Sequence, residues 1–265
     1  MSDFFDDLRQ NPNNFSFWYP KIADCGLKVP KSIIFQLPED VIRAIFHDRG
    51  SEDDDIILSY VKETMIPVLV SNNMFKPGLF IKNGTFSNQF RFNDSCGIRM
   101  FPNAFELTNR ISNICYEAEM VGAAGISEII IREFIGLDND SCNTQILDTN
   151  IPCIYGGMPL RPEFRVFYDF DNREVIKCVN YWDYDYCHDT IAKNYTDKIV
   201  YEHYYPTILN EYETRKDTVI SLVSDHMKNV DMTGKWSVDI MYDVVSDSYY
   251  LIDMAQAQRS AYWND

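Results

Sequence analysis

Residues 235–260, "KWSVDIMYDVVSDSYYLIDMAQAQRS", have the pattern of two apolar strands joined by a short polar turn. Each strand carries one acid among apolar neighbours, Asp239 in the first and Asp253 in the second. In both strands the residues beside the acid point away from it, so the two carboxylates can share one face of the hairpin. Two interpretations remain open: the acids lie on the solvent face of an edge hairpin, or they are buried beside a cation.

A second charged strand lies far upstream, in "FIKNGTFS", residues 80–87. Here an apolar strand carries Lys82 and runs into a small polar loop. Such a loop can bend closely over a phosphate chain and offer backbone N–H groups, while the lysine supplies a point charge. The same pattern is also typical of an ordinary solvated turn, and it is not a Walker A loop, which needs GxxxxGK[ST].

Two further strands carry charges between these segments. The apolar strand "IIIREFI" contains Arg132 and Glu133, and a β-hairpin that opens with "PEFRVF" places Glu163 and Arg165 on one face. Burying an unpaired carboxylate costs several kcal/mol, so acids that recur within apolar strands need cations. A divalent ion that is held by two carboxylates and by substrate phosphates fits this requirement. For Glu163 and Arg165, a surface cross-strand pair is the alternative.

Composition narrows the class of protein. The 265 residues carry a formal net charge of −16, which disfavours phosphate backbones as partners, whereas free nucleotide with magnesium remains compatible. The seven cysteines form no CxxC pair, and no window approaches the roughly 18 apolar residues that a membrane span requires. We therefore expect a cytoplasmic protein in a reducing compartment.

The order of the remaining elements favours an α+β fold with two lobes. We expect a strand at 32–37 ("SIIFQL") that leads into a helix at 38–46, and an exposed acidic loop at 47–55 ("HDRGSEDDD"). Helical spacing of apolar residues predicts helices at 103–122 and 205–230.

Taken together, these segments resemble the ATP-grasp superfamily, and most closely the cell division cycle protein 123 family of eukaryotes, which assists assembly of translation initiation factor 2. The resemblance covers most of the chain in order. The motifs that carry it are "FWYPKI", "KSIIFQLPEDVIRAI", "FIKNGTFS", "IIIREFI", "PEFRVF" and "VDI…YLIDM". The Glu-Phe-Arg hairpin and the paired-Asp hairpin are its most specific elements.

The resemblance implies an ATP-grasp fold in which ATP binds between the antiparallel sheets of two lobes. The whole chain, 1–265, would then be one ATP-grasp unit. Within it we expect an N-terminal region at roughly 1–75, a nucleotide-covering lobe at 76–140 and a magnesium-binding lobe at 141–265.

The resemblance also implies ATP and Mg²⁺ as cofactors and a role for each matched residue. Lys82 and Arg165 would contact the phosphates and are the candidate catalytic residues. Asp239 and Asp253 would hold Mg²⁺, with Gln256 as a further candidate ligand. The implied nucleotide-binding set is Lys82, Thr85, Ser87, Arg132, Glu133, Phe134, Ile135, Glu163 and Arg165.

Two departures from the family pattern limit this transfer of roles. The family continues its last motif as Asp-Phe-Asn-Pro, and the Asn oxygen helps to hold magnesium, whereas this chain has Ala255 and Gln256 after Met254. Ala255 cannot coordinate a metal, so Gln256 or water would complete the coordination sphere. The family's Ser-Gln-Arg-Asp-Tyr segment is replaced by "VNYWDYDY", which lacks the expected arginine.

Two functions remain open at the level of sequence. The first is a partner-binding assembly factor that carries ATP as a structural or switching ligand, with a protein partner such as a translation factor subunit. The second is an ATP-dependent ligase that activates a carboxylate or a phosphate end, of a peptide or an RNA, through phosphoryl or adenylyl transfer. The Tyr- and Asp-rich stretch 180–206 is a candidate partner or acceptor surface, or simply an exposed aromatic surface beside a helix.

Overall fold

The chain forms two compact units. Unit 1 comprises Met1–Ser16 and Lys31–Leu147, and unit 2 comprises Phe17–Pro30 and Asp148–Asp265. The computed structural model describes residues 2–46, 51–98, 103–123, 126–135 and 151–264. The expected regions 1–75 and 76–140 both contribute to unit 1, and the expected boundary near 140 lies outside the described residues.

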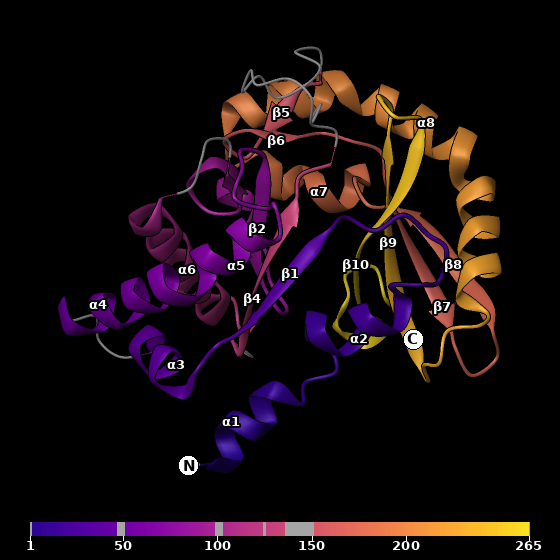
Figure 1. Cartoon of the computed structure of the whole chain (residues 1–265). Helices are drawn as coiled ribbons and strands as arrows, with labels where there is room; N and C mark the ends of the chain where they lie inside the picture. The colour runs from indigo at the N-terminus through magenta and orange to yellow at the C-terminus, as the bar shows by residue number, and fades with distance from the viewer. Residues whose placement is uncertain (1, 47–50, 99–102, 124–125, 136–150, 265) are drawn as a thin grey trace. The chain divides into compact units, whose positions relative to one another are not determined.

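Unit 1 is built on a four-stranded antiparallel sheet with the strand order β1-β4-β2-β3 (Figure 1). Its strands are β1 (Ser32–Gln36), β2 (Leu79–Asn83), β3 (Gly97–Ile98) and β4 (Glu128–Glu133). Its helical elements are α1 (Ser2–Arg9), α3 (Glu39–Phe46), α4 (Ser51–Tyr60), the π-helical turn Val61–Met65, α5 (Ile66–Ser71), the 3₁₀ segment Gln89–Asp94 and α6 (Ala104–Met120).

The two faces of this sheet differ in chemistry because side chains alternate along each strand. One face carries Phe35, Ile81, Ile129 and Ile131, which belong to the hydrophobic core together with apolar side chains of α6. In the observed register Lys82 lies opposite Ile130 and Arg132 lies opposite Phe80, so the opposite face of the sheet carries Lys82, Glu128 and Arg132. This opposite face is the polar face of unit 1.

Five of the elements expected for unit 1 are confirmed, and one is wrong in its described part. The strands in "SIIFQL", "FIKNGTFS" and "IIIREFI" are β1, β2 and β4, and the two helices are α3 and α6. Asn103 caps α6, because its side chain accepts a hydrogen bond from the Glu106 amide at 2.9 Å. Residues 51–55 of the expected acidic loop are helical instead, since α4 begins at Ser51 and includes Asp53–Asp55, and residues 47–50 lie outside the described residues. Carboxylates in the first turns of a helix are stabilised by the helix dipole, so a run of acids can begin a helix.

Unit 2 contains a second four-stranded antiparallel sheet, with the order β10-β9-β7-β8. Its strands are β7 (Glu163–Asp169), β8 (Glu174–Asn180), β9 (Lys235–Asp243) and β10 (Ser248–Gln256), and a two-stranded sheet pairs β5 (Cys153–Ile154) with β6 (Met158–Pro159). The remaining elements are α2 (Phe15–Ile22, whose first two residues belong to unit 1), α7 (Tyr184–Ile191), α8 (Tyr195–Met227) and the 3₁₀ turn η3 (Ala257–Arg259). Both predicted hairpins, β7–β8 and β9–β10, are confirmed.

The long helix α8 packs against β7 and β8 and covers one face of this sheet (Figure 1). Tyr212 of α8 stacks on Phe164 with ring centroids 5.7 Å apart, and the guanidinium of Arg215 lies 3.6 Å from the ring centroid of Tyr242. The predicted helix is confirmed, but it begins ten residues earlier than expected, because Asn194 caps it, and Pro206 lies inside it. The charged side chains of β7 and β9 lie on the opposite face of the sheet.

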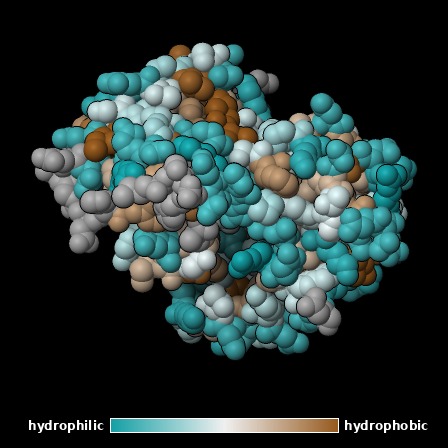
Figure 2. Space-filling model, turned by 90° about the horizontal axis from the view of Figure 1, so that it is seen from below, coloured by the Kyte–Doolittle hydropathy of each residue, from teal (hydrophilic) through white to brown (hydrophobic). Residues whose placement is uncertain are grey.

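The visible face in Figure 2 is mainly hydrophilic, and its hydrophobic patches are separated by polar side chains. Within the described ranges, no helix has both the length and the apolar character that a membrane span needs. The buried apolar side chains instead gather against the sheets, as the core of unit 1 illustrates.

Candidate functional site

The two acids of the β9–β10 hairpin lie directly beside each other, since Asp253 pairs with Asp239 in the register of the two strands. Their expected common face is confirmed, and it depends on a β-bulge between Leu251 and Asp253. Leu251 pairs with Ile240 on the α8 side, so without the extra residue at the bulge Asp253 would lie on that side too. Asp239 is only 6% exposed and β9 is an interior strand, which excludes the solvent-face interpretation for this acid.

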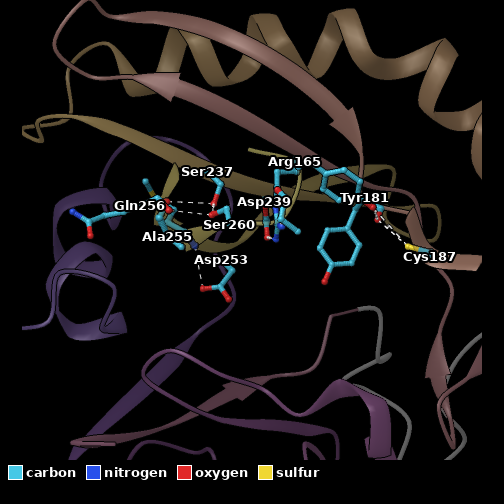
Figure 3. A network of polar contacts seen from close by, with 12 residues as sticks. Arg165, Tyr181, Cys187, Ser237, Asp239, Asp253, Ala255, Gln256 and Ser260 are labelled. Atoms are coloured by element: carbon cyan, nitrogen blue, oxygen red, sulfur yellow. Dashed lines mark hydrogen bonds and ion pairs between the residues drawn. The ribbon is translucent and has the colours of Figure 1, made fainter. Parts of the chain in front are cut away.

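Arg165 of β7 forms a two-pronged ion pair with Asp239 (Figure 3). Its Nε donates to Oδ1 at 2.8 Å and its Nη2 donates to Oδ2 at 2.7 Å, in the fork geometry that makes Arg–carboxylate pairs strong. Burial by itself would lower the pKa of Arg165, but the charge of Asp239 and its hydrogen bonds outweigh burial and raise that pKa. The resemblance implied that Arg165 contacts phosphates. In this structure its guanidinium binds the carboxylate of Asp239.

Glu163 lies on the same sheet face, two residues before Arg165, and is 7% exposed. Burial, and then repulsion by Asp239, raise the pKa of Glu163 from 4.5 to about 8, while Arg165 and Arg161 oppose the shift. At neutral pH this carboxyl is therefore mainly protonated and can donate a hydrogen bond. A cation bound nearby would favour its ionised form.

Glu163 gives a prediction for stability against pH. The pKa of Glu163 is higher in the folded than in the unfolded chain, so as the pH rises the unfolded chain loses this proton before the folded chain does. The contribution of Glu163 to stability is therefore full below pH 4.5 and is lost as the pH rises to about 8. The loss is at most about 4–5 kcal/mol, at roughly 1.4 kcal/mol for each pKa unit. We expect the unfolding free energy of unit 2, measured in EDTA, to fall less steeply between pH 5 and 8 in Glu163→Gln than in the wild type. Parallel slopes for the two proteins would contradict this prediction.

Gln256, the third predicted metal ligand, is not brought beside the two acids. It pairs with Trp236, one register position beyond Ala255 and Ser237, and successive residues of a strand point to opposite faces. In Figure 3 its side chain points away from Asp239 and Asp253. Ala255 shares the face of the acids but offers only its carbonyl, which accepts from the Ser237 hydroxyl at 3.3 Å.

Two of the predicted nucleotide-binding residues, Lys82 and Arg132, lie on the polar face of unit 1. Lys82 is 2% exposed and Arg132 is 4% exposed, and both cations lie over the ring of Phe15, at 5.9 and 5.0 Å from its centroid. Glu128, which is fully buried, accepts hydrogen bonds from the Ser16 amide at 3.1 Å and from Gln36 Nε2 at 2.8 Å. The prediction overlooked Phe15 and Glu128, and the alternation of Glu128, Ile130 and Arg132 along one strand could have revealed the acid.

Asn83, which the prediction also missed, fixes the loop that follows Lys82. Its Oδ1 accepts from the amides of Thr85 at 2.9 Å and Phe86 at 2.6 Å, so these two amides are not available to a phosphate. The Thr85 hydroxyl donates to the carbonyl of Ala123 at 3.1 Å. Gly84 is required here, because a Cβ at this position would lie 2.7 Å from Glu128 Oε1. Ser87 is half-buried in the same loop.

The predicted adenine hinge runs from Glu133 to Ile135 at the end of β4. The Glu133 amide donates to the carbonyl of Lys31 at 2.9 Å, and the Phe134 amide donates to the carbonyl of Gly78 at 3.0 Å. The Glu133 carboxylate pairs with Lys76 at 2.7 Å. The amides of Glu133 and Phe134 are therefore already used within unit 1.

A second buried ion pair lies near the start of β7 and was not predicted. Arg161 Nη1 lies 3.5 Å from Asp243 Oδ1, and these side chains are 5% and 2% exposed. Asp243 Oδ2 also accepts from the amide and the hydroxyl of Ser246. In the part of the chain that the structure describes, no group of three or more His, Cys, Asp or Glu residues is arranged to hold a metal ion.

The two antiparallel sheets and their helices define an ATP-grasp fold, as the sequence led us to expect. Two solved structures that are similar to it are those of Cdc123 from Schizosaccharomyces pombe. The C-terminally truncated form matches with a TM-score of 0.50 and 13% identity over 94% of this chain and 85% of that chain. The other Cdc123 structure matches with a TM-score of 0.50 and 13% identity over 97% of this chain and 88% of that chain.

A third similar structure is the VanG D-Ala:D-Ser ligase from Enterococcus faecalis, with a TM-score of 0.43 and 11% identity over 92% of this chain and 52% of that chain. No family model matches the sequence, and no curated protein matches it. At 13% identity the likeness to Cdc123 concerns the fold alone. Function is therefore argued from the residues of the site.

Proposed function

We propose that this chain is a Mg-ATP-binding protein of the Cdc123 type. The observation that carries the proposal is the direct pairing of Asp239 with Asp253 on the sheet face that also holds Arg165. Two neighbouring carboxylates are the ligands that magnesium takes from ATP-binding proteins, with water and phosphate oxygens in the other positions. The donor set therefore fits Mg²⁺ that is held jointly with a nucleotide.

In this proposal Asp239 and Asp253 hold the metal, which when bound neutralises charge on the phosphates. Water takes the position for which Gln256 was considered, because Gln256 points away from the two acids. Arg165 uses three N–H groups on acceptors within unit 2, and its other two can donate to a phosphate oxygen.

Unit 1, taken by itself, also carries residues that can offer groups to a nucleotide. Lys82 and Arg132 provide positive charge for phosphates, and Ser87 provides a hydroxyl from the loop that Asn83 shapes. The adenine would be bound by backbone groups between Glu133 and Ile135, chiefly carbonyl oxygens, because two of the amides already donate to Lys31 and Gly78. The Thr85 hydroxyl supports the loop by donating to the carbonyl of Ala123, and its oxygen can still accept a hydrogen bond.

For the use of ATP, we favour the assembly-factor hypothesis over the ligase hypothesis. The support is the Cdc123 fold, which matches along nearly the full length of both chains, and this is an analogy at the level of fold. A bound nucleotide would then order the site that grips a protein partner in the cytoplasm. The ligase would be supported if ATP were consumed in the presence of an acceptor.

Titration calorimetry of the purified chain with ATP, with and without Mg²⁺, tests this function. We expect binding that requires Mg²⁺, together with retention of intact ATP over hours. Sustained release of ADP or AMP on addition of peptide or RNA acceptors would instead identify a ligase. Absence of any binding of Mg-ATP would contradict the proposed function.

A further inference from the structure

The segment that follows β10 turns back across the sheet face that carries Arg165 and Asp239. We call residues Ser260–Trp263 the strap. Its first anchor is Ser260, whose hydroxyl lies 2.6 Å from that of Ser237 on β9. At its other end the Trp263 ring packs on Phe167 of β7, with centroids 5.2 Å apart.

The middle of the strap is held by hydrogen bonds to β8 and to the residue after it. Lys177 donates to the carbonyl of Tyr262 at 2.5 Å, and the Tyr262 hydroxyl donates to the carbonyl of Tyr181 at 2.7 Å. Tyr262 has φ = 68°, a left-handed conformation that non-glycine residues adopt only when the surroundings enforce it. The contacts of its ring, hydroxyl and carbonyl therefore hold the strap in one defined path.

This path brings a strap carbonyl to Arg165. The Ala261 carbonyl accepts from Arg165 Nη1 at 3.4 Å, and the guanidinium lies 5.0 Å from the ring centroid of Tyr181, whose carbonyl receives the Tyr262 hydroxyl. Arg165 is thus fixed by Asp239 at one edge, by the strap at another and by an aromatic ring on its face. Cation–π contact and hydrogen bonding both favour this orientation of the guanidinium.

We propose that the strap is a positioning element that holds Arg165 on Asp239 and thereby sets the affinity of the site for Mg²⁺ with nucleotide. The inference rests on the proposed function. The Arg165 fork competes with Mg²⁺ for Asp239, because it occupies one acceptor position on each carboxylate oxygen and its positive charge opposes that of the metal. Each contact between the strap and Arg165 or its neighbours therefore lowers the affinity for the metal in the free protein.

Two uncharged changes test the strap without altering the local charge. Tyr262→Phe removes only the hydroxyl that donates to Tyr181, and Trp263→Ala removes the ring that packs on Phe167. We expect the Kd for Mg²⁺, measured by titration at saturating ATP, to fall about 3-fold in Tyr262→Phe, as for the loss of one net hydrogen bond, and about 10-fold in Trp263→Ala, which removes a larger contact. ATP binding without Mg²⁺ should not change. Tyr195→Phe, at a residue that is 77% exposed on α8, is the matched control and should leave both affinities unchanged.

The same strap changes, made in a protein that also carries Arg165→Lys, show whether the strap alters the Kd for Mg²⁺ through Arg165. Lysine at this position cannot fork onto Asp239 and reach Ala261 at the same time, so in Arg165→Lys the strap changes should no longer alter the Kd for Mg²⁺. A purely structural role of the strap would weaken ATP binding with and without metal, in both backgrounds. That result, or an unchanged Kd for Mg²⁺, would overturn the proposal.

A readout without nucleotide separates this proposal from the proposed function. The Nε–H proton of Arg165, which is bonded to Asp239 at 2.8 Å, should exchange with solvent about 10-fold faster in Trp263→Ala than in the wild type, as measured by NMR in EDTA. An unchanged exchange rate in a protein that binds Mg-ATP would contradict the positioning role of the strap. Faster exchange in a chain that binds no Mg-ATP would contradict the proposed function.

Discussion

Asp239→Ala is expected to lower the unfolding free energy of unit 2 by about 3–5 kcal/mol, the usual cost of removing one partner of a buried ion pair. The change leaves the guanidinium of Arg165, whose side chain is 12% exposed, without the carboxylate that receives two of its N–H groups. The Ala261 carbonyl, at 3.4 Å, is a weak substitute for that charge. All four tryptophans belong to unit 2, so denaturation followed by tryptophan fluorescence reports on this unit.

The double variant Asp239→Ala, Arg165→Met supplies the control for this prediction. Replacing both ion-pair partners removes the uncompensated charge as well as the pair, so we expect the double variant to be more stable than Asp239→Ala alone. Asp231→Ala changes an exposed acid of the same unit and should alter stability by less than about 0.5 kcal/mol. A double variant that is less stable than Asp239→Ala would show that the unpaired charge of Arg165 is not the cause of the loss.

The parts of the site that could be predicted from sequence depend on the alternation of side chains along strands. Glu163 and Arg165, two residues apart, were expected on one face, and the register places them there. The acids of the last hairpin were also expected to share a face, and they do, but only because of the bulge between Leu251 and Asp253. Local alternation is thus sufficient to say which side chains share a face, provided that the strand is regular.

The parts that could not be predicted depend on irregular or distant contacts. The bulge beside Leu251 has no glycine or proline to mark it, although it decides the face on which Asp253 lies. The partner of Arg165 is 74 residues away in the sequence, and only the pairing of β7 with β9 shows that Asp239 lies beside it. The strap was missed because "SAYW" follows the last motif and has no periodic pattern.

Unit 1 shows the same division between predictable and unpredictable features. The Lys82 strand and its loop were found from composition, but the loop was expected to offer its backbone amides to phosphates. Asn83 takes two of those amides with its side chain, a local competition that asparagine often wins in turns. The cover of Phe15 over Lys82 and Arg132 joins residues that are more than 60 positions apart, so no local pattern could indicate it.

Asp253→Asn is expected to reduce the affinity for Mg-ATP at least 100-fold while leaving the fold intact. Asp253 is half-buried, and its Oδ1 accepts from the Met254 amide at 3.0 Å, a bond that the asparagine oxygen can replace. The change removes one of the two negative charges that would face the metal but almost none of the side-chain volume, so its main effect is electrostatic.

Calorimetric titration with Mg-ATP measures the affinity, and tryptophan fluorescence checks that unit 2 remains folded. ATP without Mg²⁺ should bind to the variant at least as well as to the wild type, because a negative charge has been removed near the phosphates. Equal affinities of the two proteins for Mg-ATP would place the metal away from Asp253, whereas a loss that is the same with and without Mg²⁺ would indicate damage to the nucleotide site rather than loss of a metal ligand.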